Sequence, residues 1–153
     1  MINVMDKAID FTLNNQDGKA ISLHNFIGKK VVLYFYPKDN TPGCTVEACG
    51  LRDVYDDILD IGAVVLGVSA DNETSHIKFR NKFELPFHLL ADTEKEVCMA
   101  YGAWDEKKMY GKVFFGIKRI TYIINEEGII SHVWKKVTPK NHAEEILEAL
   151  KEI

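Results

Sequence analysis

The order of apolar and polar positions along the chain predicts alternating strands and helices. Continuous apolar and aromatic runs at residues 31–36 and 63–70 are typical of strands buried on both faces. Between them, apolar side chains recur at a spacing of about 3.6 residues over 42–60, which predicts a helix. Its expected inward stripe comprises Ala48, Leu51, Val54, Tyr55, Ile58 and Leu59. A strand, a helix and a second strand in this order predict a parallel pair joined by a crossover.

The other segments complete this pattern. Turn residues at Asp17-Gly18 and Glu127-Gly128 predict two hairpins, one within residues 10–23 and one joining strands 119–125 and 129–136. Residues 103–118 have no regular period and predict a loop with turns. The expected remaining helices cover 72–83 with Ile77 and Phe83 inward, the short segment 93–102, and 141–153 with Ile146, Leu147 and Leu150 inward. Together these elements predict an α/β thioredoxin-like fold, in which helices flank a mixed central β-sheet that carries an N-terminal β-hairpin extension.

Composition limits the class of protein further. A chain of 153 residues that is 46% hydrophobic has the size and apolar content of one domain, here residues 1–153. The net charge of -4 provides no general basic field, so nucleic acid is not an expected partner. No segment approaches the roughly 18 apolar residues that a membrane span needs, and no membrane partner is expected. The first ten residues do not resemble a signal peptide, and we therefore expect a cytoplasmic protein.

The three cysteines are the candidate reactive groups. In a reducing compartment they are not expected to form a structural disulfide framework, which leaves packing, metal binding or redox chemistry. Cys44 and Cys49 have a C-x4-C spacing, and neither a CxxC pair nor suitably spaced histidines supply the four ligands of a typical zinc site. Cys98 lies on the inward stripe of its short predicted helix and is expected to pack in the core.

The segment around Cys44 favours a reactive thiolate. Thr41 is a preferred N-cap residue and Pro42 a preferred first helical residue, so Cys44 follows three residues after the cap. Unpaired backbone N–H groups and the helix dipole favour a negative charge there. A free thiol is about 3% ionised at pH 7, so complete ionisation gains only about thirtyfold in rate. Fast chemistry therefore needs other charge-stabilising groups, such as the Thr41 hydroxyl, the Cys44 N–H and a cation from elsewhere.

Cys49 is too far along an intact helix to form a disulfide with Cys44. Five residues give a rise of about 7.5 Å and a rotation of about 140°, which places the two Cα atoms roughly 9 Å apart. A disulfide requires less than about 7 Å. The two cysteines can bond only if the first turns of the helix unwind. A sulfenic acid on Cys44 is the natural intermediate, since it condenses with a second thiol.

At this point the chain resembles a known family. The stretch FYPKDNTPGCTVEAC is similar to the active-site segment of peroxiredoxins, specifically the bacterioferritin comigratory protein / peroxiredoxin Q subfamily. The family pattern P-x-x-x-T-x-x-C is matched by Pro37, Thr41 and Cys44, and a second cysteine five residues on marks this subfamily. The segment FFGIKRITYIINEEGII resembles the later part of the family, in which an arginine at a strand start, here Arg119, reaches the active site.

The resemblance implies a thiol-dependent peroxidase that reduces hydrogen peroxide and organic hydroperoxides without a metal or organic cofactor. Cys44 would be the peroxidatic cysteine and Cys49 the resolving cysteine of an intramolecular disulfide. Thr41 would hydrogen-bond the sulfur and the peroxide, Pro37 would shield the site, and Arg119 would stabilise the thiolate. Thioredoxin or a similar dithiol would regenerate the enzyme. The subfamily favours a monomer, with a dimer patch at Phe79, Phe83 and Trp104 as the alternative.

Three other hypotheses stay open from the sequence. They are a protein thiol–disulfide oxidoreductase, a redox sensor that signals by helix unwinding, and a zinc-binding module. Two acidic residues near the cysteines, Asp39 and Glu47, are interpreted as a solvated charge and a helix-start charge rather than as participants in the site.

Overall fold

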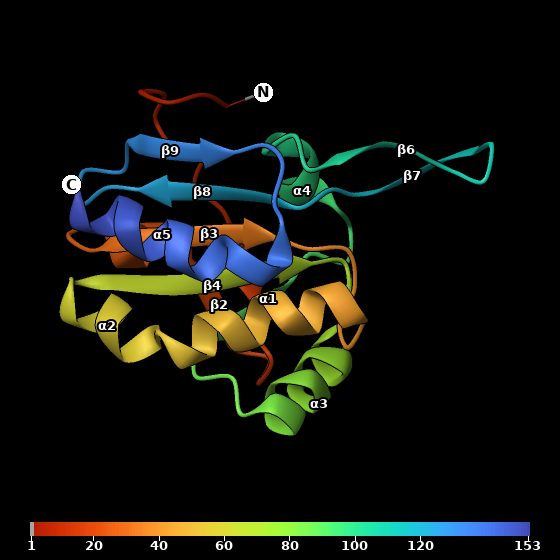
Figure 1. The fold of residues 1–153 in the computed structure, drawn as a ribbon, viewed down its shortest axis with the longest axis horizontal. Helices are drawn as coiled ribbons and strands as arrows, with labels where there is room; N and C mark the ends of the chain where they lie inside the picture. Colours follow the sequence, from red (N-terminus) through yellow and green to blue (C-terminus); the bar gives the residue numbers. More distant parts are fainter. Residues whose placement is uncertain (1) are drawn as a thin grey trace.

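The computed structural model describes residues 2–153; residue 1 of the predicted domain lies outside the described residues. Within that range a seven-stranded mixed sheet forms the centre of the molecule (Figure 1). Its strands, in spatial order, are β2 (Ala20–Ser22), β1 (Thr12–Asn14), β5 (His88–Ala91), β4 (Ala63–Ser69), β3 (Lys30–Phe35), β8 (Ile120–Ile124) and β9 (Ile130–Trp134). β3, β4 and β5 are parallel, while β8, β9 and the N-terminal hairpin pair antiparallel. The predicted thioredoxin-like arrangement is confirmed.

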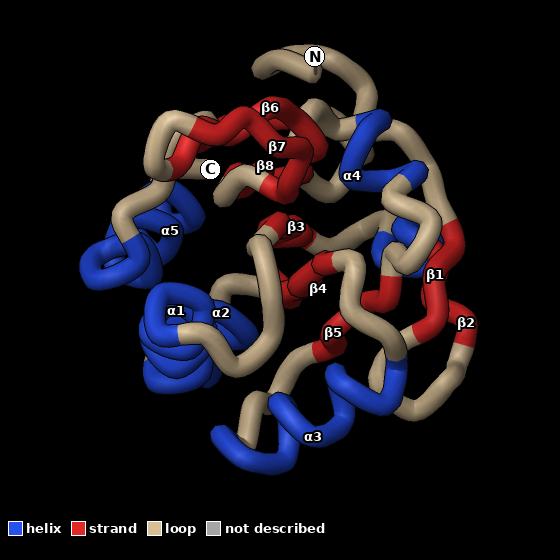
Figure 2. The backbone as a smooth tube through the Cα atoms, turned by 90° about the vertical axis from the view of Figure 1, so that its right-hand side faces the viewer, coloured by secondary structure: helices blue, strands red, loops and turns tan. Residues whose placement is uncertain are grey.

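Helices cover both faces of this sheet. They are α1 (Pro42–Asp53), α2 (Tyr55–Asp60), α3 (Glu73–Phe83), α4 (Glu96–Ala100) and α5 (His142–Lys151), with the 3-10 turns η1 (Leu23–Phe26) and η2 (Pro139–Asn141). Figure 2 shows α1, α2 and α5 together on one side of β3 and β4, with α4 on the opposite side. In the part of the chain that the structure describes, no helix is long and apolar enough to cross a membrane.

The sequence of β3 is apolar without interruption from Val31 to Phe35 because the strand is buried on both faces of the sheet. Val31, Leu33 and Phe35 belong to one core cluster, which α4 covers, whereas Val32 and Tyr34 belong to the other, which α1, α2, α3 and α5 cover. Successive side chains of a strand point to opposite faces, so burial on both faces requires an apolar residue at every position. The strand leads directly into the loop that ends at the start of α1.

The predicted helix over 42–60 is interrupted. Val54, with φ −110° and ψ 9°, leaves the helical conformation between α1 and α2. The change of direction keeps Tyr55 and Ile58 buried but turns Leu59 outward, and 46% of Leu59 is exposed. The prediction of one continuous stripe that included Leu59 was therefore wrong. In α3 the inward positions differ in part, since His76 and Phe79 are buried whereas Ile77 is only half-buried. Phe83 and Leu147 are half-buried and pack against the core, as predicted.

Residues 103–118 are not a loop. They form an antiparallel ribbon, β6 (Trp104–Met109) and β7 (Lys112–Ile117), which projects from the body of the molecule in Figure 1. Tyr110 and Gly111 both have positive φ values, 52° and 75°, as a tight primed hairpin turn requires. Most ribbon side chains are exposed, so neither face produces the apolar alternation by which a strand is predicted. β5 is a further strand that the sequence pattern did not predict.

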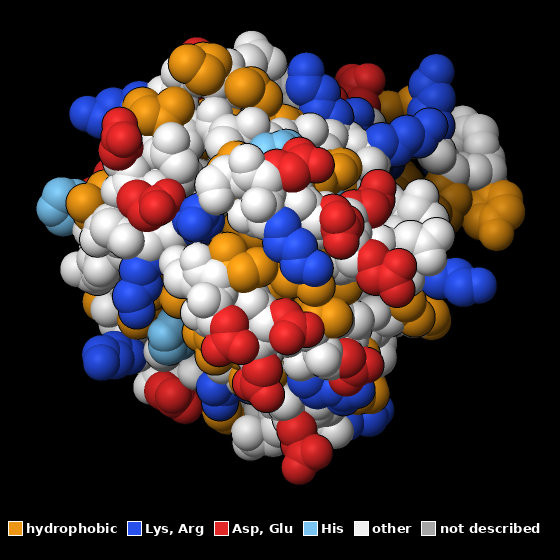
Figure 3. All heavy atoms as spheres, turned by 60° about the vertical axis from the view of Figure 1, so that its left-hand side comes forward, with side chains coloured by type: hydrophobic (Ala, Val, Ile, Leu, Met, Phe, Trp, Pro, Cys, Tyr) orange, Lys and Arg blue, Asp and Glu red, His pale blue; other side chains and the backbone are white. Residues whose placement is uncertain are grey.

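Charged side chains are interspersed on the surface. The face drawn in Figure 3 shows acidic and basic side chains side by side, without a continuous basic area.

Candidate active site

The loop after β3 places Cys44 at the start of α1. Thr41 has extended backbone angles, φ −99° and ψ 156°, and occupies the N-cap position, with Pro42 as the first helical residue. Both were predicted. The Thr41 side chain, however, does not cap the helix: its hydroxyl donates to the Lys38 carbonyl at 2.9 Å. This contact closes the loop that carries Pro37, which is half-buried.

Arg119 supplies the cation that the sequence argument required. It lies directly before β8, and its Nη1 donates to the Cys44 sulfur at 3.2 Å and to Glu47 Oε1 at 3.2 Å. Cys44 is 2% exposed. A guanidinium at hydrogen-bond distance from a buried sulfur stabilises the thiolate by a charge-assisted hydrogen bond. β3 and β8 are neighbours in the sheet, and this pairing brings two segments together that lie far apart in the sequence.

Gly43 makes room for this arginine. A Cβ atom at position 43 would lie 2.6 Å from Arg119 Nη2, closer than real Cβ contacts permit. Any side chain at Gly43 would therefore displace the guanidinium from beside the sulfur. The glycine in the TPGC stretch has a steric role that only the tertiary contact reveals.

Glu47 is buried beneath Arg119. It is 1% exposed and contacts Arg119, so the interpretation as a helix-start charge rather than a participant in the site was wrong. Burial raises the pKa of the Glu47 carboxyl from 4.5 to about 7, although Arg119 opposes the shift. Oε1 contacts Arg119, while Oε2 is one of two buried side-chain atoms in residues 2–153 that have no hydrogen-bond partner. The other is the Tyr34 hydroxyl on β3, whose pKa is raised by burial and then by Glu47 and Cys44.

The buried Glu47 gives a stability prediction. Because the folded-state pKa is raised, the folded protein binds more protons than the unfolded chain between pH 4.5 and about 7. The contribution of this group to the free energy of unfolding should therefore fall by roughly 3 kcal/mol as pH rises through that window. Urea unfolding of reduced wild type and Glu47→Gln at pH 4.5 to 8 measures it. The Gln variant should lack this fall, and parallel pH profiles for the two proteins would contradict the prediction.

Cys49 is half-buried on the same helix as Cys44. The two cysteines and Cys98 are free thiols in the structure. α1 is uninterrupted from Pro42 to Asp53, so both residues belong to one regular helix and are roughly 9 Å apart at their Cα atoms. The structure is thus the wound form, from which a disulfide requires local unwinding.

Cys98 packs as predicted. It is 0% exposed within the core cluster on the α4 side, and its N–H donates to Asp92 Oδ2 at 2.7 Å. Burial raises the pKa of its thiol well above the usual range. A thiol that stays protonated and inaccessible does not compete with Cys44.

Asp39 is the second acidic residue whose environment differs from the sequence interpretation. It was expected to be solvated but is 7% exposed, and it pairs with the buried His76, whose Nδ1 lies 2.7 Å from Asp39 Oδ2. The sequence offers little to find this pair, since the two residues are far apart in the chain and belong to different elements. Only the packing of α3 beside the loop after β3 brings them together.

Comparisons with known proteins show the family of the chain. Residues 4–133 match the AhpC/TSA family. The chain is 49% identical over 149 residues to a putative peroxiredoxin bcp of Coxiella burnetii, covering 97% of this chain and 99% of that protein. It is 43% identical over 152 residues to peroxiredoxin Bcp of Bacillus subtilis, covering 99% and 97%.

Solved structures agree as well. A PrxQ mutant from Xylella fastidiosa superposes with a TM-score of 0.95 at 34% identity, covering 99% of this chain and 97% of that one. The bacterioferritin comigratory protein of Xanthomonas campestris superposes with a TM-score of 0.89 at 37% identity, covering 93% and 90%. These relatives favour the peroxidase over the three alternative hypotheses. The chain belongs to the AhpC/TSA family, among its Bcp/PrxQ peroxiredoxins, and is a thiol-dependent peroxidase that acts on peroxide and is regenerated by a thioredoxin-type reductant.

Proposed function

We propose that Cys44 is the peroxidatic cysteine of this enzyme. The observation that carries the proposal is the 3.2 Å contact between Arg119 Nη1 and the Cys44 sulfur at the start of α1. The thiolate attacks one oxygen of the peroxide, an S–O bond forms and the O–O bond breaks. The departing oxygen takes a proton and leaves as water or an alcohol, and Cys44 becomes a sulfenic acid.

Thr41 and Pro37 shape the peroxide site in this proposal. The Thr41 hydroxyl hydrogen is committed to the Lys38 carbonyl, so the lone pairs of its oxygen are available to accept from the peroxide O–H. Arg119 keeps further N–H groups that can donate to the peroxide as negative charge moves to the leaving oxygen. Pro37, half-buried in the same loop, limits access of water.

Cys49 is the resolving cysteine in this proposal. After α1 unwinds locally, the Cys49 thiolate attacks the sulfur of the sulfenic acid. The S–S bond forms as the S–O bond breaks, and the departing hydroxyl takes a proton from solvent and leaves as water. Thioredoxin or a similar dithiol then reduces the disulfide by two successive thiol–disulfide exchanges. The half-buried position of Cys49 supports this role, since its thiol is not enclosed in the core as that of Cys98 is.

A single-turnover experiment tests both cysteines. After one equivalent of hydrogen peroxide, wild type should become two hydrogens lighter, and peptide mapping should find a Cys44–Cys49 bond. Cys49→Ser should consume the same equivalent at the wild-type rate but gain one oxygen and lose most thioredoxin-dependent turnover. Undiminished turnover in Cys49→Ser would show that another group resolves the sulfenic acid.

Hydrogen peroxide and organic hydroperoxides are the proposed substrates. Alkyl peroxide reduction is described for the Xanthomonas campestris relative, which supports the organic substrates here. Steady-state rates with hydrogen peroxide and with an alkyl hydroperoxide compare the two classes. Turnover of hydrogen peroxide alone would restrict the proposal to the smaller substrate.

We further propose a monomeric cytoplasmic enzyme of one domain. Resolution within a single chain needs no partner subunit, and regeneration by a dithiol needs a reducing compartment. The alternative dimer patch loses one member, because Phe79 is only 2% exposed and cannot contact a second copy. Sedimentation of the reduced protein as a dimer would contradict the monomer.

A further inference from the structure

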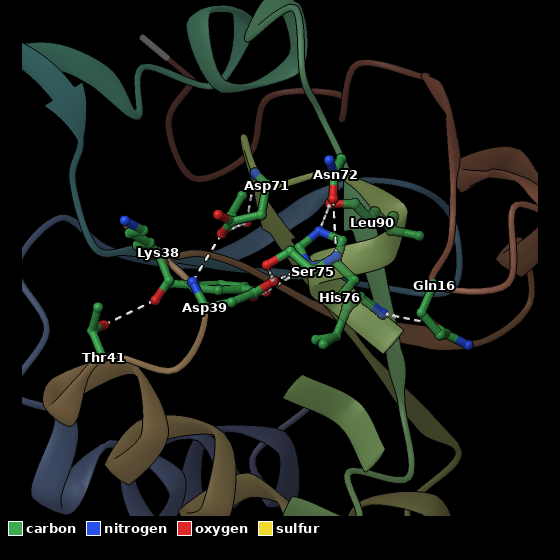
Figure 4. A network of polar contacts seen from close by, with 12 residues as sticks. Gln16, Lys38, Asp39, Thr41, Asp71, Asn72, Ser75, His76 and Leu90 are labelled. Atoms are coloured by element: carbon green, nitrogen blue, oxygen red, sulfur yellow. Dashed lines mark hydrogen bonds and ion pairs between the residues drawn. The ribbon is translucent and has the colours of Figure 1, made fainter. Parts of the chain in front are cut away.

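The loop that leads to Cys44 is tied to the rest of the molecule through one buried carboxylate. Asp39 Oδ1 accepts from the Tyr36 hydroxyl at 2.6 Å, and Oδ2 accepts from the Ser75 hydroxyl at 2.8 Å and lies 2.7 Å from His76 Nδ1. The Asp39 N–H in turn donates to Asp71 Oδ2 at 2.8 Å. Figure 4 shows Asp71, Ser75 and His76 around Asp39.

Both ring nitrogens of His76 lie at hydrogen-bond distance from an oxygen atom. Its Nε2 lies 3.0 Å from the Leu90 carbonyl, which can only accept, so Nε2 bears a hydrogen. Its Nδ1 faces the Asp39 carboxylate, and two acceptors would not approach to 2.7 Å without a proton between them. A hydrogen bond therefore joins Nδ1 and Oδ2. The imidazole of His76 links the loop at Asp39 to β5 at Leu90. Both members of the pair are buried: His76 is 0% exposed and Asp39 is 7% exposed.

The network engages the atoms that a cation would need. Asp39, Asp71 and His76 offer ligand atoms within 4.8 Å of one another. Asp71 Oδ2 already accepts from the Ser69 hydroxyl at 2.7 Å as well as from the Asp39 N–H, and a hydrogen bond joins His76 to Asp39. These contacts favour a hydrogen-bonded network over a metal site. We call the contacts of Asp39 with Tyr36, Asp71, Ser75 and His76 the anchor.

The anchor ends just before the reactive turn. Asn40 follows Asp39 with a left-handed φ of 57°, and its side chain accepts from Lys82 Nζ of α3 at 3.3 Å. Thr41 and α1 come next, so the contacts of Asp39 hold the chain on the N-terminal side of the segment that must unwind. We propose that Asp39 and His76 are positioning residues, which hold the loop of residues 36–41 against α3 and β5 and thereby set the geometry of Thr41 and Cys44 for attack on peroxide. This inference rests on the proposed role of Cys44.

The anchor acts on one step of the cycle. Oxidation of Cys44 requires the sulfur, Arg119 and Thr41 in a fixed arrangement, and small displacements of reacting groups have large effects on rate. Formation of the disulfide requires α1 to unwind, and the anchor does not span α1. Loss of the anchor should therefore slow peroxide attack and leave the disulfide step nearly unchanged, whereas general destabilisation would not separate the two steps.

Variants at Asp39 test this separation. Asp39→Ala removes the side-chain contacts of Asp39 with Tyr36, Ser75 and His76. Asp39→Asn keeps the shape of the side chain, and its amide can donate to a neutral Nδ1 of His76. Rapid-mixing mass spectrometry with one equivalent of hydrogen peroxide follows oxygen addition and disulfide formation separately. We expect oxygen addition to slow by about tenfold to a hundredfold in the Ala variant. The Asn variant should stay within about threefold of wild type, and the disulfide step should be nearly unchanged in both.

Two further variants keep the test decisive. Lys78→Ala changes an exposed residue of α3 in the same region and should match wild type. Ser75→Ala removes one hydrogen bond to Asp39 without stranding a buried charge, and it should slow oxygen addition moderately even if Asp39→Ala fails to fold. If Asp39→Ala folds and adds oxygen as fast as Lys78→Ala, the anchor is overturned. If Asp39→Ala does not fold, the same result in Ser75→Ala overturns it. Equal slowing of both steps, or an Asn variant as slow as the Ala variant, would also overturn it. Failure of wild type to react at Cys44, with neither oxygen gain nor a disulfide at this residue, would instead refute the proposed function.

Discussion

Cys44→Ser is expected to abolish peroxide consumption. A serine hydroxyl in this position is not ionised near neutral pH, and its oxygen cannot be oxidised to a sulfenic acid. The Arg119 guanidinium, which stabilises a thiolate, would stay in place without an anion to bind. The measurement is NADPH oxidation with thioredoxin, thioredoxin reductase and hydrogen peroxide, in which the variant should show only the rate without enzyme.

Cys98→Ala is the matched control for this substitution. It also removes one thiol, but that thiol is 0% exposed and lies in the core on the far side of the sheet from α1. Turnover should persist in the folded control. If Cys44→Ser kept wild-type turnover while Cys98→Ala lost it, the nucleophile would have been assigned to the wrong cysteine.

Arg119→Met is expected to lower the rate of Cys44 oxidation by about a hundredfold to a thousandfold. Removal of one preorganised donor to developing charge has an effect of this size in other enzymes. Here the same guanidinium also stabilises the attacking thiolate, and methionine fills similar space without charge. The second-order rate constant for oxidation by hydrogen peroxide, measured by rapid mixing from pH 5 to 9, gives both the loss in rate and any change in its pH dependence.

Lys118→Met controls for the loss of a positive charge nearby. Lys118 precedes Arg119 in the chain, but its ammonium is exposed and pairs with Asp105 at 3.0 Å on the ribbon. It should affect the rate little, because an exposed ion pair is largely screened by solvent. Similar losses in the two variants would mean that long-range charge, rather than the contact with sulfur, promotes the reaction.

The double variant Glu47→Gln/Arg119→Met separates position from charge. Without Arg119, the carboxyl of Glu47 would lose the interaction that opposes the rise of its pKa, and it would stay protonated near neutral pH. The double variant should therefore react as slowly as Arg119→Met alone. Recovery of the rate in the double variant would show that an unpaired Glu47 charge, and not the missing donor, caused the loss.

Local sequence signals were sufficient to predict where α1 begins and where Cys44 lies in it. Thr41 and Pro42 define the start of α1, and the helix then places Cys44 in its first turn whatever surrounds it. The separation of Cys44 from Cys49 follows from helix geometry alone. The position of Arg119 was different: an arginine before a strand is commonly exposed, and only the resemblance to peroxiredoxins suggested a role for it. Its contact with sulfur depends on the pairing of β3 with β8.

The incorrect expectations share a physical cause. Asp39 and Glu47 are charged residues in a polar segment, and a sequence cannot show which charged residue will meet a buried partner from another element. The prediction for the ribbon of β6 and β7 failed because of exposure rather than burial. Exposure on both faces removes the alternation of apolar and polar residues that predicts strands. In both cases the burial of the segment, rather than its local preference, was the missing information.

The sequence by itself determined the elements that depend on neighbours in the chain. These are the buried strands, the capped helix with its early cysteine, and the need to unwind that helix before a disulfide can form. Tertiary structure alone decided which distant groups surround the sulfur: Arg119 beside it, Glu47 beneath the arginine, and Asp39 and His76 behind the loop. Local propensity acts over one or two turns of chain, whereas the electrostatic environment of a buried thiol is produced by residues that only the packing of strands and helices brings within hydrogen-bond distance.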